Sequence, residues 1–150
     1  MTEEGRERVK LLPDPILEFD AVSPDGGWAV IFHAVPENQD FSNATTAVPF
    51  GGGAPVAICR GYCVADWGPG GAVFAVFSPA IEGGKTLLIP ISPGKSLPSL
   101  PPNGIQTKAD VASIKGAQLL EGFVNPGPTA GLHASLRQSV HRNLYRIPVQ

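Results

Sequence analysis

The stretch AVSPDGGWAVIF, residues 21–32, decides the fold, because a weaker copy of it, DWGPGGAVFAVF, follows at residues 66–77. In each copy a proline stands second in a tight turn, where it presets φ. The Gly or Asp that follows tolerates the left-handed backbone that such a turn needs. Short apolar runs flank both turns, as successive antiparallel strands require. The pattern therefore predicts a repeated unit of strand, tight turn and strand.

A third copy is predicted around NPGPT, residues 125–129. Each copy also closes on a strand that contains a proline, and these exit prolines follow the turn prolines by 25, 21 and 22 residues. So constant a spacing indicates three copies of one unit. The exit prolines are Pro49, Pro90 and Pro148. The residues expected to shape the repeated turns are Pro24, Asp25, Gly26, Pro69, Gly71 and Pro126.

A repeat of roughly 40 to 45 residues with four short strands has the period of one β-propeller blade. The chain is therefore predicted to be all-β, a partial propeller of about three four-stranded antiparallel blades. The alternative is a β-sandwich of short strands, although a sandwich would not require the turn-to-exit spacing to recur. The expected boundaries are a peripheral segment at 1–12 and a propeller at 13–150, with blades at 13–59, 60–98 and 117–150. A Pro-rich insertion is expected at 93–116, ending in a short helix within KADVASIKG, residues 108–116.

Composition limits the classes of partner. Of 150 residues, 43% are hydrophobic, 16% are charged, 18 are Gly and 16 are Pro, as in a single turn-rich globular domain. The net charge of −2 provides no basic field for phosphates, so nucleic acid is excluded as a partner. Neither an apolar run of about 20 residues nor a signal-peptide core is present. We therefore expect no membrane span and a cytoplasmic location, or an extracytoplasmic one if the chain belongs to a membrane-anchored parent.

The stretches SPDGGWAVIF and DWGPGGAVFAVF resemble the W-S-P-D-G-K repeat of TolB-type, WD-repeat-like bacterial β-propellers. The exits TLLIPI and NLYRIPV resemble the strand that follows it, so the resemblance covers about residues 14–150. Val22 departs from the Trp of that pattern, and Gly68 and Gly70 depart from its Ser and Asp. Propellers close with about four to eight blades, so the resemblance implies the C-terminal part of a larger propeller. In this family, such propellers are partners of a peptidoglycan-associated lipoprotein or follow bacterial serine/threonine kinase domains.

Motifs that would carry chemistry are weak. EGGKT, residues 82–86, has Pro79 where a phosphate loop needs its first glycine, so a hairpin turn is expected there instead. Neither the G-x-S-x-G elbow nor the kinase signatures occur in the sequence. His33, His133 and His141 are scattered rather than set at metal-ligand spacing. We therefore expect no catalytic residues, no metal and no cofactor.

Other polar and aromatic residues have structural interpretations. Cys59 and Cys63 in CRGYC could form a small disulfide, supply half of a metal site, or remain thiols in a connection between blades. The carboxylates of Asp20, Asp25 and Asp66 are expected to cap their own backbone at turns and strand ends. The aromatic residues expected to be buried between blades are Trp28, Phe32, Trp67, Phe74 and Phe77.

These observations together predict a non-catalytic protein-interaction or sensor/scaffold module. Its partner would be another protein or a second copy of the chain, bound through open blade edges. The alternative is a regulatory propeller fragment of a larger enzyme, either a serine/threonine protein kinase or a propeller-gated serine peptidase.

Overall fold

The computed structural model describes residues 10, 12, 13, 15–36, 43–129 and 131–135, and within them the chain is all-β, as predicted. No helix in this described part is long and apolar enough to cross a membrane. The first sheet contains β1 (Ile16–Val22), β2 (Trp28–Ala34), β3 (Asn43–Pro49) and β4 (Val56–Arg60). The second contains β5 (Val64–Trp67), β6 (Val73–Ser78), β7 (Lys85–Pro90) and β8 (Gln118–Glu121). The third has two described strands, β9 (Val124–Pro126) and β10 (His133–Ser135).

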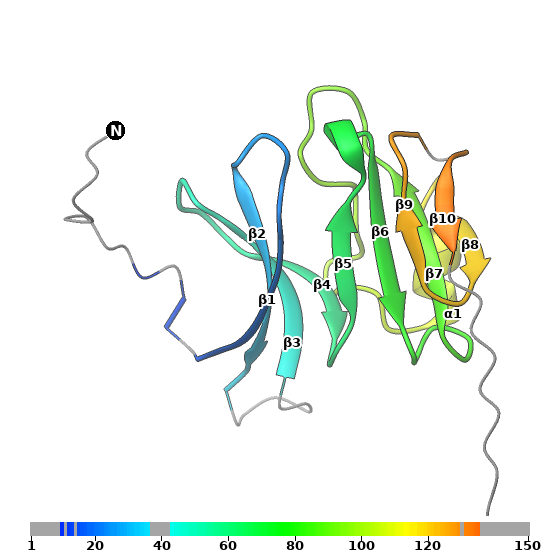
Figure 1. The fold of residues 1–150 in the computed structure, drawn as a ribbon. Helices are drawn as coiled ribbons and strands as arrows, with labels where there is room; N and C mark the ends of the chain where they lie inside the picture. Colours follow the sequence, from blue (N-terminus) through cyan, green and yellow to red (C-terminus); the bar gives the residue numbers. More distant parts are fainter. Residues whose placement is uncertain (1–9, 11, 14, 37–42, 130, 136–150) are drawn as a thin grey trace, which may run out of the picture.

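Each four-stranded sheet is an antiparallel meander in which every strand pairs with the next one along the chain. The three sheets stand face to face in chain order (Figure 1). Such an arrangement is compatible with consecutive propeller blades and also with a sandwich of packed sheets.

The first two sheets match position by position. Val30 lies opposite Ala21 in the first sheet, and Ala75, 45 residues later, lies opposite Asp66 in the second. At the other side of the central strand, Trp28 pairs with Pro49 and Val73 pairs with Pro90. The exit prolines thus end the third strand of both sheets, which confirms the predicted repeat for these two copies. Pro148 and the rest of 136–150 lie outside the described residues.

The third copy begins two residues later than predicted. Gly127 N donates to Leu132 O (2.8 Å), as Ser23 N donates to Trp28 O (2.9 Å) and Gly68 N to Val73 O (2.8 Å). Pro128 therefore holds the second position of this turn. Pro126, predicted to hold it, is instead the last residue of β9 and pairs with His133. That prediction was wrong because NPGPT contains two prolines in alternate positions, and only the hydrogen-bond register distinguishes them.

The boundary predicted at residue 117 is also wrong. β8 pairs with β7, with Leu119 opposite Leu87, and so completes the second sheet. The apolar run LLEGFV, residues 119–124, is divided at Gly122, whose φ of +70° turns the chain from β8 towards β9. The insertion consequently lies within the second sheet, between β7 and β8.

The insertion covers one end of the core. Helix η1 (Pro69–Gly71) belongs to the second tight turn, whereas α1 (Lys108–Ser113) is the short helix expected within the insertion. A capping box between Thr107 and Asp110 begins α1. Before it, Ile105 N donates to Ile58 O (2.7 Å), which places the buried Ile105 side chain against the first sheet.

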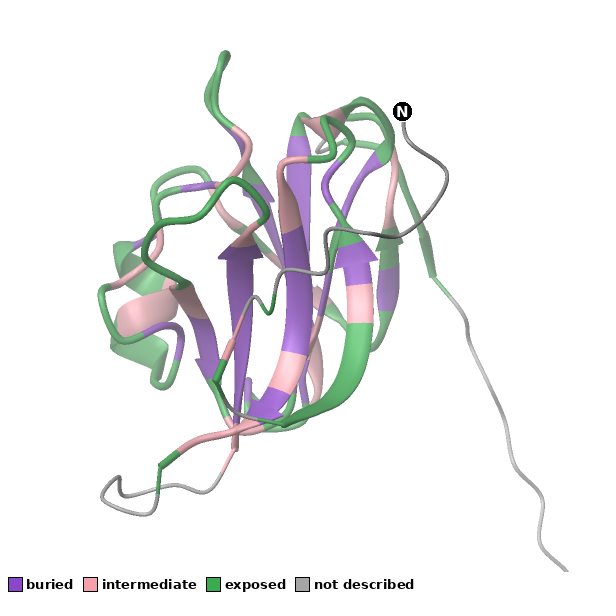
Figure 2. Cartoon of the chain, turned by 90° about the vertical axis from the view of Figure 1, so that its left-hand side faces the viewer, coloured by how far each residue is buried: buried purple, intermediate pink, exposed green. Residues whose placement is uncertain are grey.

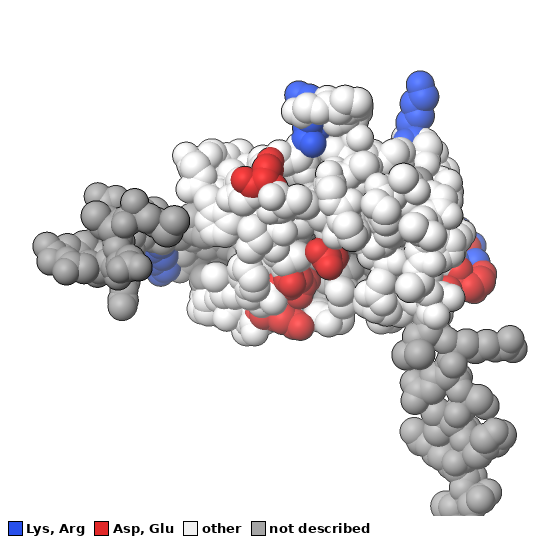
Figure 3. Space-filling model, turned by 45° about the horizontal axis from the view of Figure 1, so that its top comes forward, with Lys and Arg blue, Asp and Glu red and all other residues white. Residues whose placement is uncertain are grey.

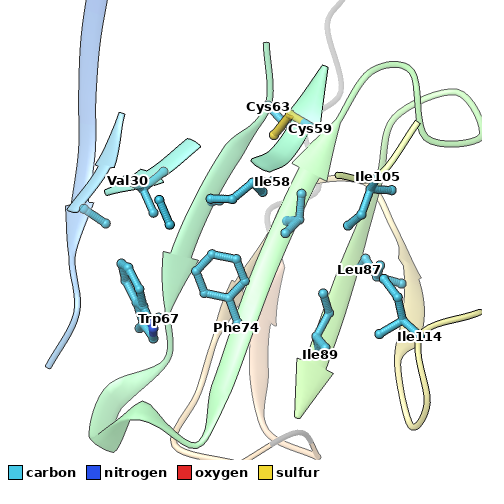
Figure 4. Close-up of a cluster of buried hydrophobic side chains, with 14 of the residues drawn as sticks. Val30, Ile58, Cys59, Cys63, Trp67, Phe74, Leu87, Ile89, Ile105 and Ile114 are labelled. Atoms are coloured by element: carbon cyan, nitrogen blue, oxygen red, sulfur yellow. A yellow bond between two sulfur atoms is a disulfide. The ribbon is translucent and has the colours of Figure 1, made fainter. Parts of the chain in front are cut away.

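The main core lies between the first and second sheets (Figure 4). Alternate residues of β6 point to its two faces, so Phe74 and Val76 enter this core while Val73 and Ala75 face the third sheet. Of the aromatic residues expected here, Phe74 and Trp67 are buried, and their rings meet edge to face at 5.0 Å. Trp28, Phe32 and Phe77 are half-buried. Labelled core residues in Figure 4 include Val30, Ile58, Leu87, Ile89 and Ile114.

Candidate functional site: the groove between two repeated turns

The first two tight turns have the same internal hydrogen bonds. Gly26 N donates to Ser23 O (2.8 Å), and Gly71 N donates to Gly68 O (2.9 Å). Gly26 and Gly71 both have a φ close to +70°, which a residue with a side chain adopts only with strain. Asp25 accepts from Gly27 N (3.0 Å), so its predicted role in capping its own backbone is confirmed.

A groove of about 270 Å³ lies where the two turns meet. The ring of Pro24 stands over Gly71, whose Cβ position would be 3.5 Å from Pro24 Cγ. The loop after β7 closes the groove with Lys95 and Ser96. Of the residues predicted to shape the turns, Pro24, Asp25 and Gly71 line this groove, whereas Gly26, Pro69 and Pro126 do not.

Asp25 and Ser96 fasten the first turn to the second sheet. The Asp25 carboxylate accepts from the Ser23 and Ser96 hydroxyls and from Gly27 N, and these donors lower its pKa to about 2. Ser96 O in turn accepts from Trp67 Nε1 (2.6 Å). The groove therefore holds a carboxylate that is ionised at neutral pH and the Lys95 ammonium group beside an indole ring.

The histidines considered as metal ligands lie apart. His33 is buried in the first sheet, with Nε2 2.9 Å from Thr46 Oγ1 and Nδ1 2.7 Å from Ala34 O. His133 is exposed on β10, and His141 lies outside the described residues. Within the described part of the chain, no three His, Cys, Asp or Glu side chains are close enough to hold a metal ion.

EGGKT forms the turn between β6 and β7, as predicted. Gly84 N and Lys85 N both donate to Ile81 O (3.0 Å each), which closes the turn. Lys85 forms ion pairs with Glu121 (2.9 Å) and Glu82 (3.2 Å), and hydrogen bonds to these carboxylates raise the pKa of the Lys85 ammonium group. The lysine is thus engaged by carboxylates of its own sheet.

Cys59 and Cys63 form a disulfide across the connection from β4 to β5 (Figure 4). Both cysteines are buried, and the bond spans only four residues of sequence. Of the three states left open for this pair, the structure therefore has the disulfide.

Because the loop closed by this disulfide is short, chain entropy predicts a modest stabilisation. Replacing both Cys59 and Cys63 with Ser is expected to lower the free energy of unfolding by about 2 kcal/mol. The measurement is urea unfolding of the variant and of the unaltered chain, with and without a reducing agent. Reduction should reproduce the loss in the unaltered chain and leave the variant unchanged. An unaltered chain that is insensitive to reduction would contradict the prediction.

Sequence reasoning missed a second repeated device that joins successive sheets. Thr86 Oγ1, fully buried in β7, donates to Gly122 O (2.6 Å) and accepts from Val124 N (3.0 Å). At the matching position of β3, Thr45 Oγ1 contacts Gly61 O, Cys63 O and Cys63 N, each at 3.2 Å. We call these contacts the threonine clips. In the sequence, a Thr stands four residues before each of the exit prolines Pro49 and Pro90.

An aromatic pair accompanies each threonine clip. Tyr62 meets Phe32 edge to face at 5.3 Å, and Phe123 meets Phe77 in the same way at 5.3 Å. Both connections thus begin with Gly followed by an aromatic residue, a pattern visible in the sequence as Gly61-Tyr62 and Gly122-Phe123. Their recurrence shows that the units repeat in their connections as well as in their turns.

Comparisons of the chain with protein-family models, with curated proteins and with solved structures found no match. The internal repeat is therefore the basis on which this chain can be classified: an all-β protein of repeated antiparallel sheets, joined by equivalent turns and clips.

Proposed function

We propose that this chain is a non-catalytic protein-interaction module of the β-propeller kind, and that it binds through the outer face of its first sheet. The outer face is the side of that sheet turned away from the second sheet. Figure 2 views the molecule from this side. The proposal depends on one observation, the match between this face and a face that already binds a sheet.

The match follows from the register. Ala29, Ile31 and Val48 on the outer face correspond to Phe74, Val76 and Ile89 of the second sheet. Those three residues form the surface by which the second sheet packs against the first. The outer face therefore has the position and apolar character of a surface that receives a neighbouring sheet.

The rim of the outer face is exposed. Ile16, Phe19 and Val22 of β1 have exposed fractions of 51%, 57% and 45%. Ala29, Ile31 and Val48 at the centre are already buried in the chain, with Leu12 packed against them, so a partner would first meet the rim. Large apolar side chains that remain exposed together on an edge strand favour association. The occupant that fits is the apolar face of another four-stranded sheet of this kind. In a solution of the isolated chain, a second copy of the chain supplies this apolar sheet face.

Self-association tests the proposal. Light scattering should give a mass that rises with concentration, and Phe19→Lys should weaken the association at least about tenfold, because it places a charge at the rim. Tyr62→Lys is the matched control: Tyr62 is also exposed (43%), but it packs against Phe32 on the opposite side of the sheet. A folded chain that stays monomeric at every concentration, or equal effects of the two variants, would refute the docking face.

A further inference from the structure

Asp20 occupies an irregular position at the contact between the first and second sheets. The register of β1 against β2 shifts between Phe19 and Ala21, so Asp20 is the extra residue of a bulge. β1 and β5 lie side by side (Figure 1), and the Asp20 carboxylate accepts a hydrogen bond from the Ala65 backbone of β5. The prediction that Asp20 caps its own backbone is therefore wrong. Asp20 instead links the first strands of two sheets.

One oxygen of this carboxylate is left unsatisfied. Asp20 Oδ2 is buried and has no hydrogen-bond partner in the described part of the chain. An unpaired buried carboxylate oxygen loses its hydration without compensation, and this penalises the ionised form. The bulge thus holds a charge in a place where a neutral group would be more stable.

The groups around Asp20 add to the penalty. The charges that act on it are those of Glu18 on its own strand and of Asp66 on β5, and both are acidic. Tyr62, in the connection before β5, faces Glu18 and Asp20; burial and both charges raise the pKa of its hydroxyl. Figure 3 shows acidic side chains gathered on this side of the molecule. Burial and Glu18 together raise the pKa of Asp20 to about 6, although the Ala65 amide opposes the shift.

We propose that Asp20 is a pH-sensitive contact that strengthens the packing of the first sheet against the second as the solution becomes acidic. Protonation removes the repulsion from Glu18 and Asp66, and it removes the ionic charge from a carboxyl group whose Oδ2 is buried without a partner. The Ala65 backbone remains a hydrogen-bond donor to the carboxyl group. The neutral side chain therefore keeps the contact between β1 and β5 without the cost of a buried charge.

The direction of the pH effect on stability follows from the difference between the pKa of Asp20 in the folded and in the unfolded chain. The pKa of Asp20 is about 6 in the folded chain, against an ordinary value of 3.8. The extra stability is therefore complete below pH 3.8 and is lost as the pH rises through about 6. Between pH 7 and pH 5 these two pKa values give a rise of about tenfold in the ratio of folded to unfolded chain.

The test is urea unfolding of the full chain at pH 7 and pH 5, together with a ¹³C NMR titration of the Asp20 carboxyl carbon. In the unaltered chain the ratio should rise about tenfold on acidification, and the Asp20 signal should titrate near pH 6. Asp20→Asn should lose most of the rise. Glu18→Gln should move the titration of Asp20 to lower pH, because it removes one neighbouring charge.

Asp110→Asn is the control, since backbone amides of Gln106 and Thr107 lower the pKa of this exposed carboxylate and keep its titration outside the tested range. It should weaken α1 but leave the response between pH 7 and pH 5 intact. The proposal is overturned if Asp20→Asn retains the full response, or if Asp20 titrates near pH 4. Should Asp20→Asn fail to fold, the NMR titration of the unaltered chain decides alone.

Discussion

Replacing Gly68 with alanine is expected to lower the free energy of unfolding by about 3 kcal/mol, because the added Cβ has no space. Gly68 has an extended backbone (φ −66°, ψ 155°) that alanine adopts without strain. Its Cβ, however, would collide with Gly127 O and would lie 3.3 Å from Pro126 Cβ in the third sheet. The second and third sheets would have to move apart. Thermal or urea unfolding of the purified variant measures the loss.

Gly26→Ala is the matched control in the first turn. Gly26 has a φ of +70°, but nothing lies within 4 Å of its Cβ position. Alanine there incurs only the backbone strain, about 1 kcal/mol. If the two substitutions cost the same, the close packing of the second turn against the third would be refuted.

Replacing Thr86 with valine is expected to destabilise the chain by about 2 kcal/mol, since the buried Val124 amide loses its acceptor and the partly buried Gly122 carbonyl loses its donor. Thr86 is fully buried, and its hydroxyl satisfies both Gly122 O and Val124 N. Valine has nearly the same shape, so packing changes little and the cost reports the lost hydrogen bonds. Amide hydrogen exchange should also become faster at Val124.

Thr45→Val tests whether the two threonine clips are equivalent. The same kind of connection is held at Thr45, but the disulfide between Cys59 and Cys63 also constrains it. While the disulfide is intact, Thr45→Val should therefore lower the free energy of unfolding by less than Thr86→Val does. After reduction of the disulfide, the loss caused by Thr45→Val should become larger than it was before reduction. A Thr86→Val chain as stable as the unaltered one would show that the clip contributes nothing.

The repeated turns were predictable because their conformation is local. Pro24 and Pro69 restrict φ, and Gly26 and Gly71 supply the left-handed backbone, so residues close in sequence determine each turn. The strands beside them follow from alternating apolar residues. Where two interpretations were locally equal, as for Pro126 and Pro128, the choice depended on pairing with β10, and local reasoning could not make it.

The strand pairing of residues 118–121 shows the same limit at longer range. QLLE lies next to FVNP in sequence, yet it pairs with residues of β7 that lie 30 to 36 positions earlier. Gly122 separates the two segments, but a single glycine within an apolar run does not indicate whether a strand bends or ends there.

The candidate groove was predictable only in part, since Pro24, Asp25 and Gly71 come from the repeated turns, whereas Lys95 and Ser96 come from the insertion.

By itself, then, the sequence determined the all-β class, the repeated tight turns and the register of the exit prolines, since these depend on backbone restrictions and on alternation within short segments. The tertiary structure alone decided which sheet each strand joins, which carboxylate lacks a partner, and where the threonine clips lie. Asp20 and Thr86 owe their roles to residues 45 and 38 positions away, Ala65 and Val124. Such roles arise from burial and from contacts between sheets, neither of which exists until the sheets have packed.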